Sequence, residues 1–289
     1  MYERILVPVD GSEGSEEVLY HAGEMAQRTG GEVTLLFVAD TSRDSVTVVE
    51  DDVVDALEQE GSGVVDDAAE VLDSLGVGYS TDVVQGDPVP TIVDYAERYD
   101  YDAVVMPTQG KAGLSKQLLG SVTEKVVRLS ERPVVTVRTG TERSLSFPYE
   151  RVLVATDGSS AATYAAEHAV DLAASLDATL HVLSVVDDSL LGLDVRSALS
   201  GAEAEEAAEE AVENVVIAAE SRDVEVETHV EHGSPHEAML DAIESYDIDA
   251  VVMGTTGKGA VDRILLGSVA EKTVRTSPVP VVTVHNASE

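Results

Sequence analysis

The sequence contains no cysteine and no tryptophan, and only two phenylalanines, among 289 residues. Without cysteine it has no disulfide, no thiolate nucleophile and no sulfur-ligated metal, which suits the cytoplasm better than an oxidising exterior. No apolar run approaches the ~18 residues of a membrane-spanning helix, so no membrane contact is expected. We expect no signal peptide either, because a strand-like run, Ile5 to Val9, follows closely on Met1.

Positive charge is also scarce. The chain has 55 Asp plus Glu against 18 Lys plus Arg, a net charge of -37. The acidic residues are spread over the whole chain, which is typical of a surface adapted to high salt and not of an acidic tail. Such a surface disfavours nucleic-acid binding, which needs a basic face. It still allows a phosphate ligand, because at molar salt the Debye length falls to about 3 Å and distant charges are screened.

The sequence repeats itself. Residues 2–137 can be laid over residues 149–284 at a constant offset of 147 without a gap. Asp10-Gly11-Ser12 then coincides with Asp157-Gly158-Ser159, and Glu124-Lys125 with Glu271-Lys272. A repeat of this kind indicates a tandem duplication. We therefore predict two domains, residues 1–138 and 149–289, joined by a linker at residues 139–148.

Within each copy, short β-branched runs alternate with helical stretches, the pattern of parallel βαβ units. In the first copy we expect strands near residues 3–9, 32–38, 78–84, 101–106 and 133–138, and helices near 14–29, 50–75, 89–98 and 118–129. The predicted fold class is α/β, with two tandem Rossmann-like domains. Each has a five-stranded parallel sheet of order 3-2-1-4-5, which brings the ends of its first and fourth strands together.

A glycine loop follows the fourth strand of the second copy. Gly254 and Gly257-Lys258 come directly after the strand, and Gly267-Ser268 opens the next helix. Glycines let main-chain N–H groups approach an anion, and a helix N-terminus attracts negative charge. Ser268 is a candidate both for capping the helix and for donating to a phosphate oxygen. The loop matches neither a Walker A motif nor the dinucleotide fingerprint, and we interpret it as a phosphate loop.

This spacing, Gly-x2-Gly-x9-Gly-Ser, resembles the ATP-binding branch of the universal stress protein family. The resemblance covers nearly the whole chain, one family domain in each copy, and implies the adenine nucleotide alpha hydrolase-like fold. It implies that ATP, or else ADP or AMP, binds with Mg²⁺, with Asp157 at the adenosine moiety. The implied site in the second copy comprises Ala155, Thr156, Asp157, Val185, Met253, Gly254, Gly257, Lys258, Gly267, Ser268, Val269 and Ala270.

The corresponding site in the first copy is expected to be weaker or to prefer an AMP-like ligand. Its residues are Pro8, Val9, Asp10, Val38, Gly110, Lys111, Gly120, Ser121 and Val122. It departs from the family pattern at Pro107, which stands where the second copy has Gly254. Proline fixes φ and lacks an N–H donor, so the loop loses one contact to an anion.

The five lysines have two competing interpretations. Lys111, Lys116, Lys125, Lys258 and Lys272 all lie in the glycine loops or the helices after them. Lys111 and Lys258, with Arg263, are interpreted as attracting phosphate, and Lys125 and Lys272 as complementing helix C-termini.

Asp10 and Asp157 could be turn residues instead of ligand contacts, with Ser12 and Ser159 as helix caps. His232 and His236 flank Gly-Ser-Pro, which favours a turn and helix start over a metal site.

Together with these patterns, the family resemblance implies a cytoplasmic stress-response protein that binds an adenine nucleotide and acts as a switch or interaction module for an unknown protein partner. The apolar final strands, residues 133–137 and 280–284, favour pairing as an intramolecular pseudo-dimer, and a homodimer is left open. No general base other than Asp157 stands out, so no catalytic residue and no metal ligand is assigned. The alternatives are a slow ATPase or phosphotransferase, a nucleotide-free scaffold, and a flavin binder.

Overall fold

The computed structural model describes residues 1–12, 15–40, 52–110, 119–141, 145–187, 195–256 and 266–285, without the side chains of residues 52–58 and 195–200. The chain divides into two compact units, Met1–Pro148 and Tyr149–Glu289. No helix among the described residues is both long and apolar enough to cross a lipid bilayer.

Each unit contains the same sequence of elements. The first unit has strands β1 (Arg4–Pro8), β2 (Glu32–Asp40), β3 (Tyr79–Gly86), β4 (Ala103–Pro107) and β5 (Val134–Val137), and helices α1 (Ser15–Thr29), α2 (Asp52–Leu75), α3 (Pro88–Arg98) and α4 (Ser121–Leu129). The second unit has strands β6 (Arg151–Ala155), β7 (Thr179–Val186), β8 (Val226–His232), β9 (Ala250–Gly254) and β10 (Val281–Val284), and helices α5 (Ser160–Leu176), α6 (Val195–Glu220), α7 (Pro235–Ser245) and α8 (Ser268–Thr276).

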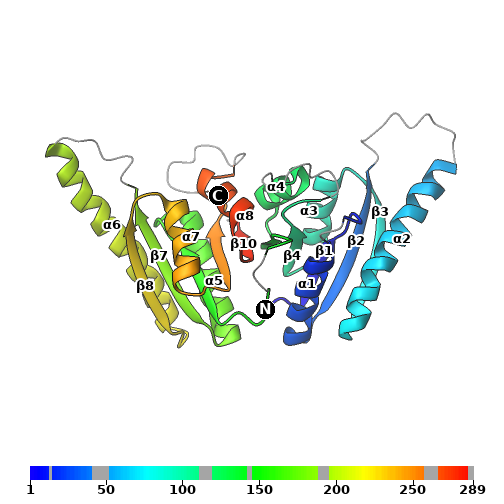
Figure 1. Cartoon of the computed structure of the whole chain (residues 1–289), viewed down its shortest axis with the longest axis horizontal. Coiled ribbons are helices and arrows are strands. Elements are labelled where there is room, and N and C mark those ends of the chain that lie inside the picture. Colours follow the sequence, from blue (N-terminus) through cyan, green and yellow to red (C-terminus); the bar gives the residue numbers. More distant parts are fainter. Residues whose placement is uncertain are drawn as a thin grey trace. The chain divides into compact units, whose positions relative to one another are not determined.

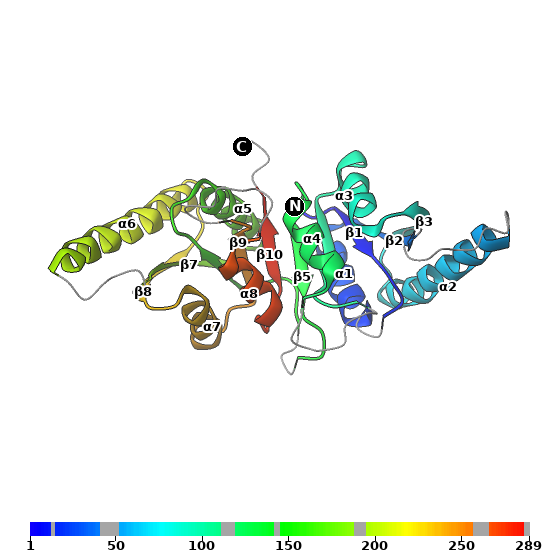
Figure 2. The same cartoon turned by 90° about the horizontal axis from the view of Figure 1, so that it is seen from above.

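The strands of each unit form a parallel sheet in the predicted order. It runs β3-β2-β1-β4-β5 in the first unit and β8-β7-β6-β9-β10 in the second. The fold prediction is confirmed. In the second unit, α5 and α6 cover one face of the sheet and α7 and α8 the other (Figures 1 and 2). Because both faces are covered, the central strands are apolar throughout, and all of Ala103–Pro107 is buried.

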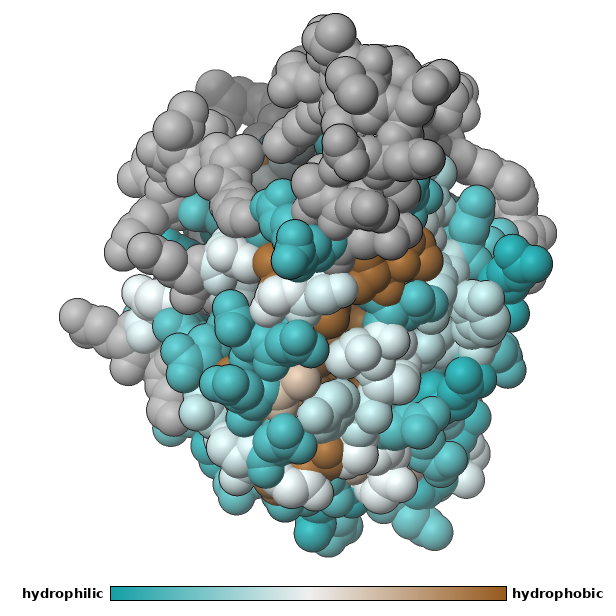
Figure 3. All heavy atoms as spheres, turned by 90° about the vertical axis from the view of Figure 1, so that its right-hand side faces the viewer, coloured by the Kyte–Doolittle hydropathy of each residue, from teal (hydrophilic) through white to brown (hydrophobic). Residues whose placement is uncertain are grey.

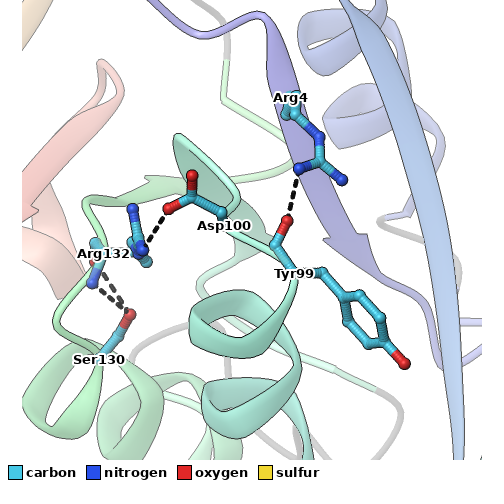
Figure 4. Close-up of polar contacts among 5 residues, drawn as sticks. All are labelled: Arg4, Tyr99, Asp100, Ser130 and Arg132. Atoms are coloured by element: carbon cyan, nitrogen blue, oxygen red, sulfur yellow. Dashed lines mark hydrogen bonds and ion pairs between the residues drawn. The ribbon is translucent and has the colours of Figure 1, made fainter.

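Polar contacts close the amino ends of the strands. In the first unit the Arg4 guanidinium donates to the carbonyl of Tyr99, and Arg132 pairs with Asp100 at 2.6 Å (Figure 4). The Ser130 hydroxyl donates to the carbonyl of Arg132 at 2.9 Å and accepts from its N–H at 3.1 Å. These groups are engaged in joining the strand ends to the loops that precede them.

The repeat preserves this end of the sheet. A carboxylate oxygen of Asp102 accepts from the N–H of Arg4 at 3.0 Å, and Asp249 does the same for Arg151 at 2.8 Å. With the amino ends closed in this way, the carboxyl ends are left for a binding site, as is usual in open α/β sheets.

The solvent-facing surface agrees with the composition. Figure 3 shows the face on the right of Figure 1, and hydrophilic residues cover most of its described part.

Candidate functional site

A cavity of about 640 Å³ lies at the carboxyl ends of the strands in the second unit. Its position follows from the strand order, since β6 and β9 are neighbours, with Val154 beside Val252, and their ends meet at one edge. The cavity wall includes the predicted site residues Ala155, Thr156, Asp157, Val185, Met253, Gly254, Gly267, Ser268, Val269 and Ala270. The predicted residues Gly257 and Lys258 lie outside the described part of the chain, as does Arg263.

Asp157 forms a turn and also faces the cavity. Its Oδ1 accepts from the N–H of Ser159 at 3.0 Å, and Gly158 between them has the positive φ of 72° that glycine tolerates best. The Ser159 hydroxyl accepts from the N–H of Ala162 at 3.2 Å and so caps α5. Ser159 is thus a helix cap, as interpreted, and the turn and ligand interpretations of Asp157 are compatible.

The first turn of α8 forms another part of the cavity wall. The prediction that Ser268 caps this helix is wrong, because Gly267 is the cap residue and Ser268 is the first helical residue. The N–H of Gly267 donates to the carbonyl of Thr255 at 2.8 Å, which holds the helix start against the end of β9. Since a glycine cap offers no side-chain acceptor, the first N–H groups of α8 are available to an anion in the cavity.

Gly254 is required by packing as well as by its place in the loop. A Cβ atom built on Gly254 would lie 2.9 Å from the backbone carbon and oxygen of Ala161, at the start of α5. Any side chain here would push α5 away from β9. In the first copy, where the matching residue is Pro107, the residue matching Ala161 is Gly14. The glycine of this pair is therefore residue 254 in the second copy and residue 14 in the first, although position 14 lies outside the described residues.

The sequence analysis missed the apolar wall that helices contribute to the cavity. Ala204, Ala207 and Ala208 of α6 line it, as do Pro235 and Met239 of α7. The three alanines are spaced i, i+3, i+4 and therefore lie on one helix face, a signal that was hidden by the many glutamates of the same helix. Asp187, which follows β7, is a second carboxylate on the wall that the sequence did not single out.

The first unit keeps the framework of the site. Asp10 and Gly110 meet, since a Cβ atom built on Gly110 would lie 2.5 Å from Oδ2 of Asp10. The N–H of Gly120 donates to the carbonyl of Thr108 at 2.8 Å, as at the matching loop of the second unit. Of the other predicted residues, Pro8 ends β1, Val9 follows it, Val38 lies in β2, and Ser121 and Val122 begin α4. Lys111 lies outside the described residues.

An aromatic ring takes the place of small residues in the first unit. Phe37 and Gly61 match Ser184 and Ala208, which both line the cavity of the second unit. A Cβ atom built on Gly61 would lie 2.7 Å from Cδ1 of Phe37, so the ring packs directly on the backbone of α2. Phe37 is only 9% exposed. The ring therefore fills space between β2 and α2 that small side chains leave open in the second unit.

His232 ends β8 and His236 lies in the first turn of α7, so the turn and helix start predicted between them are present. Ser234 is the cap of α7 and Pro235 its first residue. His236 shares a hydrogen bond with the hydroxyl of Thr276 at 3.3 Å, and its pKa is lowered by burial and by nearby Lys272. This hydrogen bond engages Nε2 of His236.

Comparison with known proteins agrees with this architecture. The model of the Universal stress protein family matches the chain twice, over residues 1–138 and 148–285. A universal stress protein of Methanocaldococcus jannaschii is 36% identical over 141 residues, which cover 48% of this chain and 83% of the relative. One of Methanothermobacter thermautotrophicus is 36% identical over 144 residues, covering 48% of this chain and 97% of that protein.

Solved structures extend the similarity to the full length. The crystal structure of a universal stress protein from Archaeoglobus fulgidus has a TM-score of 0.74 and 31% identity, and 99% of each chain is covered. A structure from Pseudomonas aeruginosa with 21% identity and a TM-score of 0.67 covers 98% of this chain and 92% of that one, and shares the fold.

Proposed function

Because the chain belongs to the universal stress protein family, with one family domain in each half, we propose that its second domain binds an adenine nucleotide, with ATP as the preferred form. The proposal rests on one observation, the cavity of about 640 Å³ that combines an apolar wall with the start of α8. Cavities that hold ligands of this size are typically about 300–1,000 Å³. Ala155, Val185 and Met253 suit an adenine ring, and Gly267 to Ala270 suit the phosphates.

The charges on the cavity wall support this orientation of the nucleotide. Among the described residues that line it, Asp157 and Asp187 carry the ionisable side chains. Carboxylates accept hydrogen bonds, which suits the hydroxyls of a ribose and disfavours direct contact with phosphate. The phosphates are therefore assigned to the main-chain N–H groups and hydroxyl at the start of α8. Mg²⁺ usually keeps several waters and one or two carboxylates, so it would find candidate ligands in the same two aspartates.

The output of binding is proposed to be a conformational or interaction signal to a protein partner, and not catalysis. The Oδ1 atom of Asp157 is already an acceptor in its turn, and the carboxylate is assigned to the ribose, so it is not placed to activate water at the phosphates. Hydrolysis of ATP would then be slow. Steady-state turnover at rates of about 1 s⁻¹ or more that Asp157→Ala abolishes would establish the enzymatic alternative instead.

Calorimetry with ATP, ADP and AMP in molar potassium chloride tests nucleotide binding. We expect ATP to bind, and Asp157→Ala to weaken its affinity by at least about tenfold through the loss of a charge-assisted hydrogen bond. Asp10→Ala, the same change in the first domain, is the matched control and should leave this affinity nearly unchanged. Mass spectrometry of nucleotide released from fresh protein identifies the natural form. No binding of any adenine nucleotide would favour a nucleotide-free scaffold.

A further inference from the structure

Two imidazoles and a carboxylate meet on the sheet of the second domain, away from the residues that line the nucleotide cavity. They belong to His181 of β7 and to Glu227 and His229 of β8. Nδ1 of His181 lies 3.1 Å from Nε2 of His229 and 3.7 Å from Oε2 of Glu227. All three atoms fall within 4.8 Å of one another. We propose that this cluster binds a divalent first-row transition metal ion, with Zn²⁺ as the representative case.

The strand register holds the three side chains together. His181 is the parallel-strand partner of Glu227, and Leu183 is the partner of His229. Since side chains alternate along a strand, Glu227 and His229 project to the same face, next to His181. The cluster is therefore built on two paired strands and not on loops. Such a site needs little reorganisation when the ion enters.

The distances suit a tetrahedral ion. Two nitrogens bound to Zn²⁺ at about 2.0–2.1 Å in a tetrahedral arrangement lie about 3.3 Å apart, close to the 3.1 Å between the two histidines. His229 also lines a pocket of about 260 Å³ that contains Glu231 and Tyr246. The Glu227 side chain is 57% exposed, so water or an outside ligand can reach the cluster from solvent. Three protein ligands with one open position are characteristic of zinc sites that exchange a ligand.

The surroundings orient the imidazoles. His181 is 3% exposed, and the ring of Tyr246 stacks on that of His229 with 4.2 Å between their centroids. Burial lowers the pKa of both histidines, although Glu227 acts in the opposite direction. Neutral imidazole has a nitrogen lone pair to give to a metal ion, and it suits zinc, copper, iron and nickel.

The first domain has no imidazole at the same three positions. Thr34 and Ser80 stand where the second domain has His181 and Glu227, and their hydroxyls share a hydrogen bond of 2.9 Å. Asp82 stands where the second domain has His229, and accepts from the hydroxyl of Tyr95 at 2.8 Å. The first domain therefore satisfies these positions by hydrogen bonds alone. If the histidine pair were only a replacement for that hydrogen bond, it would not bind a metal ion.

Titration of the metal-stripped full chain with Zn²⁺ in 1 M potassium chloride, where surface carboxylates bind weakly, tests the proposal. We expect one ion per chain, and His229→Gln should weaken its binding by more than about 100-fold, at least the loss seen when a ligand's supporting contacts are removed. His232→Gln removes another imidazole at the end of the same strand and is the matched control, with no change expected. Co²⁺ should give the intense visible absorption of a tetrahedral ion.

The proposal fails if no ion binds at stoichiometric concentration, or if His229→Gln and His232→Gln bind Zn²⁺ equally well. Should His229→Gln fail to fold, Glu227→Gln alters an exposed side chain and provides the same comparison. Weaker binding than in His232→Gln then supports the site, and equal binding overturns it. These measurements need no nucleotide, so they stand apart from the test of the nucleotide site.

Discussion

At the end of β9 a single missing side chain allows α5 to approach the strand. Gly254 lies so close to Ala161 that a Cβ atom would be 2.9 Å from its carbonyl carbon. Gly254→Pro, which copies the first domain, should therefore abolish ATP binding in the second domain by displacing α5 and removing one N–H. Calorimetry with ATP measures the loss.

A second substitution, copied from the first domain, separates the effect of the clash from the effect of the missing N–H. Ala161→Gly copies Gly14, the residue that accompanies Pro107 in the first domain. If the clash is the main cause, Gly254→Pro with Ala161→Gly should regain part of the stability and of the ATP affinity, because the second change removes the Cβ contact at 3.1 Å and leaves the backbone contacts at 2.9 Å. If the missing N–H is the main cause, the double variant should regain stability alone. Full affinity in the single variant would mean that this loop does not hold the phosphates.

A second residue-scale prediction concerns the aromatic ring of the first domain. Ser184→Phe combined with Ala208→Gly transfers the Phe37–Gly61 pair into the second domain. The ring should pack on α6 as it packs on α2, fill part of the cavity and weaken ATP binding by at least about tenfold, since overfilled packed sites cost about 1–3 kcal/mol. Calorimetry checks the affinity and thermal unfolding checks the fold. Ala208→Gly alone is the control, and unchanged affinity in the double variant would place the ligand elsewhere.

At the scale of elements, α1 carries a buried base. His21 is 1% exposed, and burial lowers its pKa from 6.5 to about 4. The unfolded chain then binds a proton that the folded chain does not, so stability is complete above pH 6.5 and falls as the pH drops toward 4. Between pH 7.5 and pH 5 this one residue should remove about 2 kcal/mol from the free energy of unfolding.

Urea unfolding at pH 7.5 and pH 5, at one salt concentration, measures this effect. His21→Leu removes the titrating group, so the difference between the two pH values should shrink by about 2 kcal/mol even if the variant is less stable overall. An unchanged difference would show that His21 becomes protonated in the folded chain.

The elements also show how far the sequence alone could predict this molecule. The repeat predicts the two domains, and the alternation of strands and helices predicts the open parallel sheet. The edge that carries the site follows because Asp157 and the glycine loop end the first and fourth strands, which are neighbours in this order. The cap of α8 was assigned one residue too late, because Gly and Ser both occur at helix starts and only the backbone conformation distinguishes them. The alanines of α6 and the packing of Phe37 on Gly61 join residues distant in sequence. No local pattern could have revealed those contacts.

At the scale of the whole molecule, one fold occurs twice with different chemistry. Both domains keep the Asp-Gly-Ser turn and the glycine cap of the last helix. They differ where a side chain decides what can bind. Pro107 and Phe37 of the first domain match Gly254 and Ser184 on the cavity wall of the second. Thr34 matches His181 of the proposed metal cluster. The repeated features are those that build the backbone frame. Divergence of the remaining positions would let the two domains bind different ligands, as proposed above for the second domain.

The acidic surface provides the last prediction. A net charge of -37 repels itself and favours the expanded unfolded chain, most strongly where screening is weak. The Debye length falls from about 10 Å at 0.1 M salt to about 3 Å at 1 M, so the melting temperature should rise by several degrees over this range of potassium chloride. Sucrose at equal osmolality does not screen charge and is the control. A melting temperature that ignores salt, or rises equally in sucrose, would contradict adaptation to high salt. ATP affinity should rise with the same screening, because the repelled ligand is itself an anion.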